Sequence, residues 1–109
     1  MPYSENLAER VRRMLKQRSG IDEKKMFGGV GFLMNGNMLV GIWHDSLIAR
    51  VGVVQAADAL KQPFVKEFDI TGKPMTGWIV IEPEGIDFDE QLKGWITAAE
   101  NFVATLPRK

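Results

Sequence analysis

The stretch that decides the fold is Gly29-Val30-Gly31-Phe32-Leu33-Met34-Asn35-Gly36-Asn37-Met38-Leu39-Val40-Gly41. Two apolar runs flank Asn35-Gly36, a dipeptide that favours a type I′ turn because both turn positions need a positive φ. The stretch therefore predicts an antiparallel hairpin. Counting outward from a two-residue turn gives the expected pairs: Phe32 with Leu39, Val30 with Gly41, and Gly31 with Val40. Each glycine then faces a large or branched side chain, which covers its exposed backbone.

A third strand is expected after the hairpin. A second tight turn at Asp45-Ser46 leads into residues 47–51, which are apolar apart from Arg50. The expected pairs are Trp43 with Ile48 and Gly41 with Arg50. Together the three strands form an antiparallel meander.

Helical periodicity marks two segments on either side of this meander. Ser4 is a suitable N-cap for an amphipathic helix that extends to Gly20. A short helix follows the meander and is halted by Pro63. The apolar face expected for this short helix consists of Val53, Val54, Ala57 and Leu60.

The last part of the sequence predicts two strands and the longest helix. Residues 66–70 alternate and favour an edge strand, whereas residues 78–81 are apolar on both faces and favour a more central one. Asp87 and Glu90 resemble a capping box for the last helix, and Phe88 belongs to its apolar face. The order of elements predicts an α+β fold, with an antiparallel sheet of about five strands, an N-terminal helix, a short middle helix and a long C-terminal helix packed on it.

Composition excludes several classes of protein. The 109 residues carry 14 Lys and Arg against 14 Asp and Glu, and we expect one domain over residues 1–109. Zero net charge removes the usual electrostatic basis for autonomous nucleic-acid binding. The absence of cysteine excludes disulfides, thiolate metal sites and a cysteine nucleophile. No secretory signal is recognisable and no apolar run reaches the roughly 20 residues that span a bilayer, so we expect a cytoplasmic protein without a membrane partner.

Residues that suggest catalysis or metal binding are better explained by structure. His44-Asp45-Ser46 has the residue types of a hydrolase triad, but consecutive residues at a turn point in different directions. The acidic residues of 82–90 lack the spacing of a Ca²⁺ loop. Residues 28–31 are rich in glycine but precede a strand, where phosphate loops require a helix. We therefore expect no catalytic residues, no metal site and no cofactor.

A basic patch is expected at the start of the chain. Residues 1–25 contain seven Lys and Arg and four Asp and Glu, a local net charge of +3. The patch consists of Arg10, Arg12, Arg13, Lys16, Arg18 and Lys24. These side chains could contact phosphate, although a solvated helix face is the commoner explanation in a neutral protein. Nucleic-acid binding is therefore expected to be weak.

Two features suggest a binding surface elsewhere. In the expected register Arg50 shares a sheet face with Trp43 and lies opposite Gly41, a notch that could receive a carboxylate or a phosphate. The alternative is an internal ion pair with a carboxylate of the sheet or a helix. The loop 71–77 is longer than a hairpin needs, and Met75 is exposed there unless the last helix covers it.

Several motifs resemble the amino-terminal domain of the TfoX/Sxy family of competence regulators, from about Asn6 to Leu106. The motifs are Lys25-Met26-Phe27-Gly28-Gly29, Phe32-x-x-Asn35-Gly36-x-Met38, Asp45-x-Leu47-x-x-Arg50 and Thr71-Gly72-Lys73-Pro74-Met75-x-Gly77-Trp78, followed by Trp95. The resemblance implies an α+β domain of an intracellular bacterial protein. For longer members, which carry a second helical domain, it implies a transcriptional co-regulator of DNA-uptake genes that acts with the cyclic-AMP receptor protein. The family offers no catalytic residues to assign.

The leading hypothesis is a non-enzymatic regulatory or protein-interaction domain that resembles transcriptional co-regulators of competence genes. Its candidate surface consists of Lys25, Phe27, Arg50, Lys73, Met75 and Trp78. One alternative is direct DNA binding through the basic N-terminal helix. Another is a small ligand-binding domain or enzyme that uses Arg50 and the Lys73 loop. Apolar residues on both faces of the meander also favour a homodimer.

Overall fold

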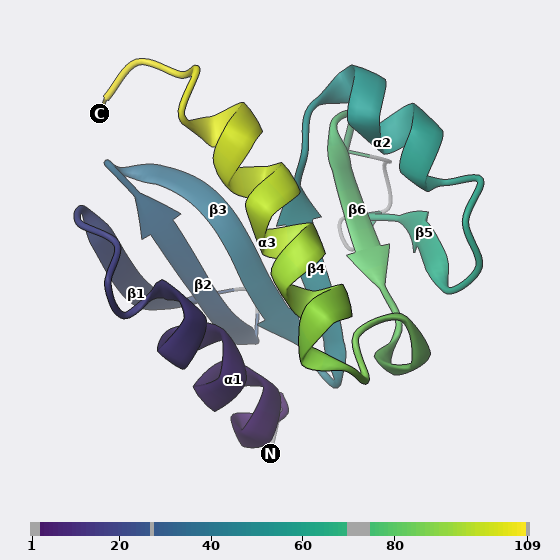
Figure 1. Ribbon diagram of the computed structural model, residues 1–109, viewed down its shortest axis with the longest axis horizontal. Helices are drawn as coiled ribbons and strands as arrows, with labels where there is room; N and C mark the ends of the chain where they lie inside the picture. The colour runs from purple at the N-terminus through teal and green to yellow at the C-terminus, as the bar shows by residue number, and fades with distance from the viewer. Residues whose placement is uncertain (1–2, 27, 70–74, 109) are drawn as a thin grey trace.

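The fold is one antiparallel sheet with helices packed on it, in a computed structural model that describes residues 3–26, 28–69 and 75–108. Within these residues six strands follow the order β1-β2-β3-β4-β6-β5. The strands are β1 (Ile21–Met26), β2 (Gly29–Met34), β3 (Asn37–Trp43), β4 (Ser46–Arg50), β5 (Val65–Glu67) and β6 (Trp78–Ile81). The helices are α1 (Glu5–Leu15), α2 (Val53–Ala59) and α3 (Asp89–Val103), with a 3-10 turn at Pro83–Gly85. This arrangement confirms the predicted α+β fold (Figure 1).

The strand that the sequence did not reveal is β1. Its sequence, Ile-Asp-Glu-Lys-Lys-Met, has four consecutive charged residues, all exposed, so no alternation of polar and apolar side chains marks it. It pairs with β2 along its whole length at the outer edge of the sheet. Charged side chains suit this position because they discourage another chain from adding to the edge. The sheet therefore has one strand more than the approximately five expected.

The predicted hairpin forms, but its expected register was wrong beyond the first pairs. Asn35 and Gly36 have φ values of 53° and 84°, as a type I′ turn requires. The register then shifts between Phe32 and Leu33. The observed pairs are Phe32 with Val40, Gly31 with Gly41, and Val30 with Ile42. The irregularity leaves Leu39 as an extra residue of β3, and both Leu39 and Val40 are buried in the main core.

The side chains that pack over the backbone of Gly31 also differ from the expected one. A Cβ atom at Gly31 would lie 2.8 Å from Cε of Met38 and 2.9 Å from Sδ of Met26. Two flexible methionine side chains from β1 and β3 therefore meet over this glycine, in place of the single valine expected opposite it. Methionine suits such an irregular gap because its side chain is long and unbranched.

The third strand of the meander is present with a different turn. Trp43 pairs with Ser46 and Gly41 pairs with Ile48, so the turn residues are His44 and Asp45. His44 has a φ of 57°, a left-handed conformation that His and Asp tolerate better than branched residues. The expected turn at Asp45-Ser46 was one residue too late, and the expected pairs of Trp43 with Ile48 and Gly41 with Arg50 were wrong.

The remaining strand positions match the predictions. The short strand β5 lies at an edge of the sheet, and β6 lies between β4 and β5. Within the predicted segment 66–70, the strand begins one residue earlier and ends at Glu67, while Ile70 lies outside the described residues. The inner position of β6 agrees with its apolar sequence, because both of its faces are covered.

The helices α1 and α3 begin at local capping contacts. Oγ of Ser4 accepts a hydrogen bond from the Leu7 N–H at 3.1 Å, as predicted, but α1 ends at Leu15 and not at Gly20. The capping box expected from Asp87 and Glu90 was wrong. The residue before α3 is Phe88, whose backbone N–H donates to Oε1 of Gln91 at 2.9 Å. Glutamine thus supplies the backward contact expected of the glutamate.

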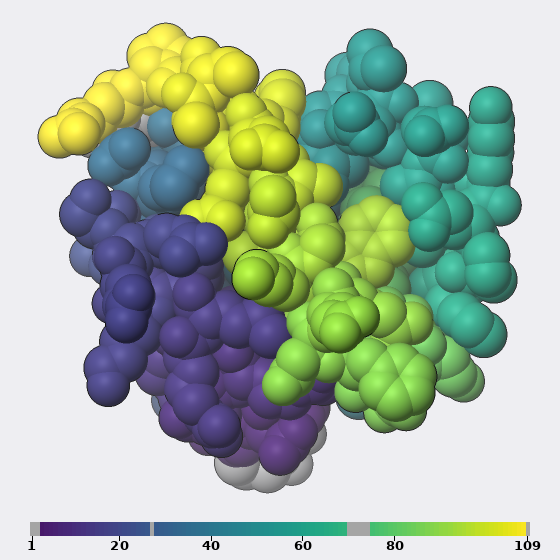
Figure 2. Space-filling view, viewed as in Figure 1, coloured from purple at the N-terminus to yellow at the C-terminus, as the bar shows by residue number. Residues whose placement is uncertain are grey.

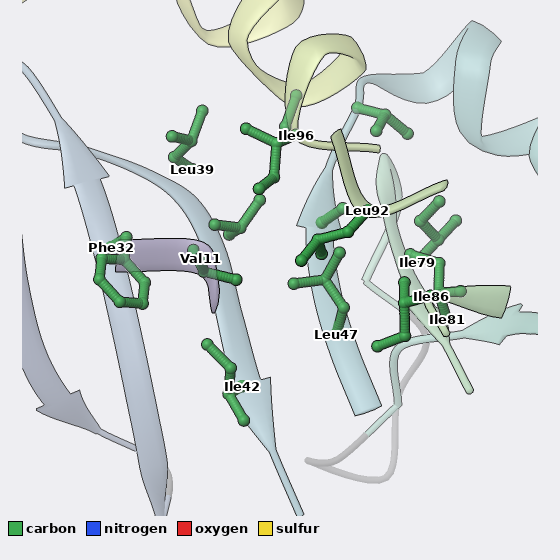
Figure 3. Packing of buried hydrophobic residues seen from close by; sticks show 14 of the residues in the cluster. Val11, Phe32, Leu39, Ile42, Leu47, Ile79, Ile81, Ile86, Leu92 and Ile96 are labelled. Atoms are coloured by element: carbon green, nitrogen blue, oxygen red, sulfur yellow. The ribbon is translucent and has the colours of Figure 1, made fainter. Parts of the chain in front are cut away.

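All three helices bury side chains in one core on one side of the sheet. The buried residues of α1, α3 and the strands interlock there, as Figure 3 shows for Val11, Phe32, Ile42, Leu47, Leu92 and Ile96. The opposite side holds a smaller cluster of Ile48, Phe68 and Val80, with Trp43 and Trp78 packed against it. The homodimer expected from apolar residues on both faces of the sheet stays a prediction.

Candidate functional site

The described residues of the predicted binding surface do not form one patch. Arg50 and Trp78 are direct neighbours on β4 and β6. Met75 is exposed just before β6, whereas Lys25 lies on β1 at the far edge of the sheet. Phe27 and Lys73 lie outside the described residues. Lys25 therefore lies apart from Arg50, Trp78 and Met75, and the candidate site is sought around Arg50.

Arg50 lies between two aromatic rings. Its guanidinium carbon is 5.4 Å from the centroid of the Trp78 ring and 5.8 Å from the centroid of the Phe102 ring. The side chain is half-buried, and among the described residues it forms neither a hydrogen bond nor an ion pair. The internal carboxylate partner considered above is thus not found in the described part of the chain. The aromatic neighbour of Arg50 is Trp78, which pairs with it across β4 and β6, and not the expected Trp43.

Phe102 also lines a groove between α2 and α3, of which Arg50 itself is not a lining residue. The groove has two parts. Its first part has a volume of about 370 Å³ and is lined by Val51, Gly52, Val53, Val54 and Phe102, together with Gln55 and Ala98. A second part of about 490 Å³ shares Gln55 and Ala98 and continues past Gln62, Pro63, Phe64, Gln91, Gly94 and Trp95. Figure 2 shows α2 (teal) and α3 (yellow-green) side by side on the face turned to the viewer. We call this surface the α2/α3 groove.

Exposed apolar side chains border the α2/α3 groove. Val53 is 61% exposed and Val54 is 80% exposed, while Phe64 is 44% exposed. The face of α2 that contacts the core consists instead of the small residues Ala56 and Ala59. The small alanine side chains allow the helix to approach the sheet closely, so the alanine face turns inward. The apolar face expected to be buried, which includes Val53 and Val54, is therefore the outer face of α2.

The sequence contained a signal for this surface that was misread. Val53 and Val54 are the first two residues of a helix of only seven residues, whose alanines could form a second apolar face. A short helix with apolar residues on both sides must expose one of them. Phe88 was misplaced in the same way, since it is 69% exposed and stands outside the core expected for the last helix.

The predicted basic patch is largely neutralised by neighbouring carboxylates. Nη2 of Arg12 lies 2.8 Å from Oε2 of Glu23, and Nη1 lies 2.6 Å from Oε2 of Glu9. Nε of Arg18 lies 2.6 Å from Oε2 of Glu100. The other ion pairs of this patch are Arg10 with Asp89 and Arg13 with Glu9. Because these arginines already bind carboxylates, less of their charge is available to a nucleic-acid phosphate.

The contact between Arg12 and Glu23 also affects proton binding. The hydrogen bond from Arg12 lowers the pKa of the Glu23 carboxyl below its ordinary value of 4.5. The same contact raises the pKa of Arg12 above the ordinary value. The pair therefore favours the charged forms of both side chains in the folded protein.

Substitution of Glu23 by glutamine should lower the free energy of unfolding at neutral pH by less than about 1 kcal/mol, because the pair is partly exposed. The folded protein binds the Glu23 proton less readily than the unfolded chain does. The stabilisation is therefore present above pH 4.5 and lost as the pH falls through the folded pKa. Urea unfolding of both proteins over the acid range measures this, and a difference that persists in strong acid would contradict it.

Among the described residues, no group of three His, Asp or Glu side chains converges as a metal ion would require. His44 and Asp45 form the turn between β3 and β4, and Ser46 begins β4. In the same part of the chain, no helix combines the length and the apolar character needed to cross a membrane. The features that remain as a candidate site are the α2/α3 groove and the arginine beside it.

Comparison with known families gives one match. Residues 13–103 match the family described as the TfoX N-terminal domain, so the match covers most of the chain. No curated protein and no solved structure matches the chain significantly.

Proposed function

Because the chain belongs to the TfoX N-terminal domain family, we propose that it is a non-enzymatic protein-interaction domain that acts in the regulation of transcription. The surface that we assign to this function is the α2/α3 groove. The observation that carries the proposal is the pair of exposed valines at the start of α2, Val53 and Val54, beside an apolar hollow. We place this function in the cytoplasm, where bacterial transcription proteins act.

The composition of the groove suits a protein partner. Its first part is apolar, with Ala98 and Phe102 of α3 facing the two valines of α2. Its outer part adds amide side chains from Gln55, Gln62 and Gln91. Apolar centres with polar rims are typical of protein interfaces, and contiguous exposed apolar patches on a small domain mark such sites.

The two alternatives have less support in the structure. Direct DNA binding would use the four arginines at the start of the chain, all of which are paired with carboxylates. An enzymatic reaction would need nucleophiles, acids or bases that converge on one point. The enzymatic alternative assigns a role to Arg50. The contacts that the structure gives this side chain are with the aromatic rings of Trp78 and Phe102.

The substitution of Val54 by aspartate should weaken partner binding about tenfold or more, because it places a charge in the apolar part of the groove. Folding should be little affected, since the side chain is 80% exposed. The measurement is a pull-down from bacterial lysate with quantitative mass spectrometry. We expect the original protein to recover a transcription protein, for which the family resemblance suggests the cyclic-AMP receptor protein.

A matched control is the substitution of Ala57 by aspartate. Ala57 is an exposed residue of the same helix and does not line the groove, so the new charge is the same and its position differs. This variant should recover the partner as the original protein does. Equal recovery by the Val54 variant would contradict the assignment of the groove. A lysate that yields no transcription protein, together with a small molecule that raises the melting temperature, would contradict the proposed function.

A further inference from the structure

We propose that the protein segment bound in the α2/α3 groove carries a side-chain carboxylate, and that Arg50 binds this carboxylate at the Phe102 end of the groove. The inference rests on the proposed function and names the chemistry of its partner. It combines an apolar hollow, a cation that has no ion-pair partner in the described part of the chain, and the aromatic ring that the two share.

The position of Arg50 joins the cation to the groove. Phe102 lines the first part of the groove, and the guanidinium carbon of Arg50 lies 5.8 Å from the centroid of this ring. The same guanidinium carbon is 5.4 Å from the centroid of the Trp78 ring, which packs against the cluster on the opposite face of the sheet. A guanidinium that is packed against aromatic rings is restrained, while its N–H donors lie in its own plane and stay available. Arg50 is not itself a lining residue of the groove, so a carboxylate of the occupant would meet its planar fork at the Phe102 ring, at the end of the hollow.

The lack of a carboxylate partner among the described residues distinguishes Arg50 from the arginines of the basic patch. Arg10, Arg12, Arg13 and Arg18 each contact a carboxylate of this chain. Arg50 is half-buried and, in the described residues, contacts none. A partly desolvated guanidinium gains most from a charge-assisted hydrogen bond, and a carboxylate can accept two such bonds from its fork.

Charge complementarity indicates which occupant fits. The first part of the groove is lined by apolar residues and Gln55, with no carboxylate that would repel an anion. The acidic lining residue of the groove, Glu90, belongs to its second part. The fitting occupant is therefore an extended or helical protein segment whose apolar side chains fill the hollow and whose Asp or Glu reaches Arg50.

The test starts with short random peptides displayed on phage and selected on the immobilised full chain. Enriched peptides should combine apolar residues with one Asp or Glu at a fixed spacing. A synthetic enriched peptide and its amide analogue, with Gln or Asn in place of the acid, are then compared by fluorescence anisotropy. The amide analogue should bind the original protein about tenfold more weakly. The Arg50→Gln variant should bind both peptides equally.

Two further variants keep this test independent of folding. Arg50→Lys retains the charge without the planar fork, and its affinity for the acidic peptide should lie between those of the original protein and Arg50→Gln. Arg13→Gln removes an exposed arginine of α1, far from the groove in sequence, and should bind as the original protein does. Thermal unfolding followed by circular dichroism confirms that each variant is folded.

The outcomes separate the inference from the proposed function. If Val54→Asp abolishes peptide binding and Arg50→Gln does not, the carboxylate inference is overturned and the groove stands. If neither substitution matters, both are overturned. If inorganic phosphate releases the peptide and acetate at equal ionic strength does not, the inference that Arg50 binds a carboxylate is overturned, and Arg50 binds a phosphate group instead. Without any enriched peptide the inference fails, while the pull-down still decides the proposed function.

Discussion

Replacement of Gly52 by alanine should lower the free energy of unfolding by about 2–6 kcal/mol, a large fraction of the stability of a small domain. Gly52 joins β4 to α2 with φ 88° and ψ 161°, a conformation that is essentially restricted to glycine. A Cβ atom there would also lie 2.6 Å from Cδ1 of Phe102 and 2.9 Å from Cε1. Backbone strain and steric overlap therefore add, and urea unfolding measures their sum.

Gly94 provides a control of opposite sign. It lies within α3, and a Cβ atom at this position would meet nothing within 4 Å. Its replacement by alanine should raise the free energy of unfolding by about 0.5–1 kcal/mol, because alanine loses less conformational freedom in a helix. Equal stability of the Gly52 and Gly94 variants would contradict the geometry described for the start of α2.

The two causes at Gly52 can be separated by a second substitution. Phe102→Ala removes the ring that the new Cβ would overlap, and leaves the positive φ unchanged. In the double variant the penalty of Gly52→Ala should fall to the backbone contribution of about 1–3 kcal/mol. A penalty that is the same with and without the ring would show that Phe102 does not pack over Gly52.

The parts of the fold that were predictable from sequence depend on local chemistry. The Asn35-Gly36 turn needs two positive φ values, and few other dipeptides provide them. Ser4 caps α1 through its own side chain. The register was not predictable, because the irregularity between Phe32 and Leu33 has no special residue to mark it. The irregularity allows both Leu39 and Val40 to be buried in the main core. That burial depends on helices that are distant in the sequence.

The candidate site shows the same division. The sequence singled out Arg50 and Trp78 separately, and their contact across β4 and β6 needed the correct register. Phe102 was not predicted as part of the site, since it lies on α3 and reaches Arg50 through tertiary packing. The groove depends on which face of α2 turns inward. That choice is made by the small volume of Ala56 and Ala59 against the sheet, which a pattern of apolar residues does not reveal.

Truncation of Leu92 to alanine should lower the free energy of unfolding by about 2–5 kcal/mol, because it leaves a cavity under α3. Leu92 is fully buried and lies toward the sheet, beside Leu47 and Ile79 (Figure 3). The neighbouring Lys93 is exposed, and its replacement by alanine should change the free energy of unfolding by less than about 0.5 kcal/mol. Urea unfolding of the two variants measures this difference.

The Leu92 variant also tests how the groove depends on the core. The wall formed by Ala98 and Phe102 lies on the same helix, about two to three turns beyond Leu92. If α3 is held mainly by its buried face, the loosened helix should bind the selected peptide more weakly even where the variant is still folded. Full affinity in a folded but destabilised variant would instead mean that Phe102 is fixed locally, by its contacts with Gly52 and Arg50. The Gly52 substitution would then be the more damaging of the two for binding.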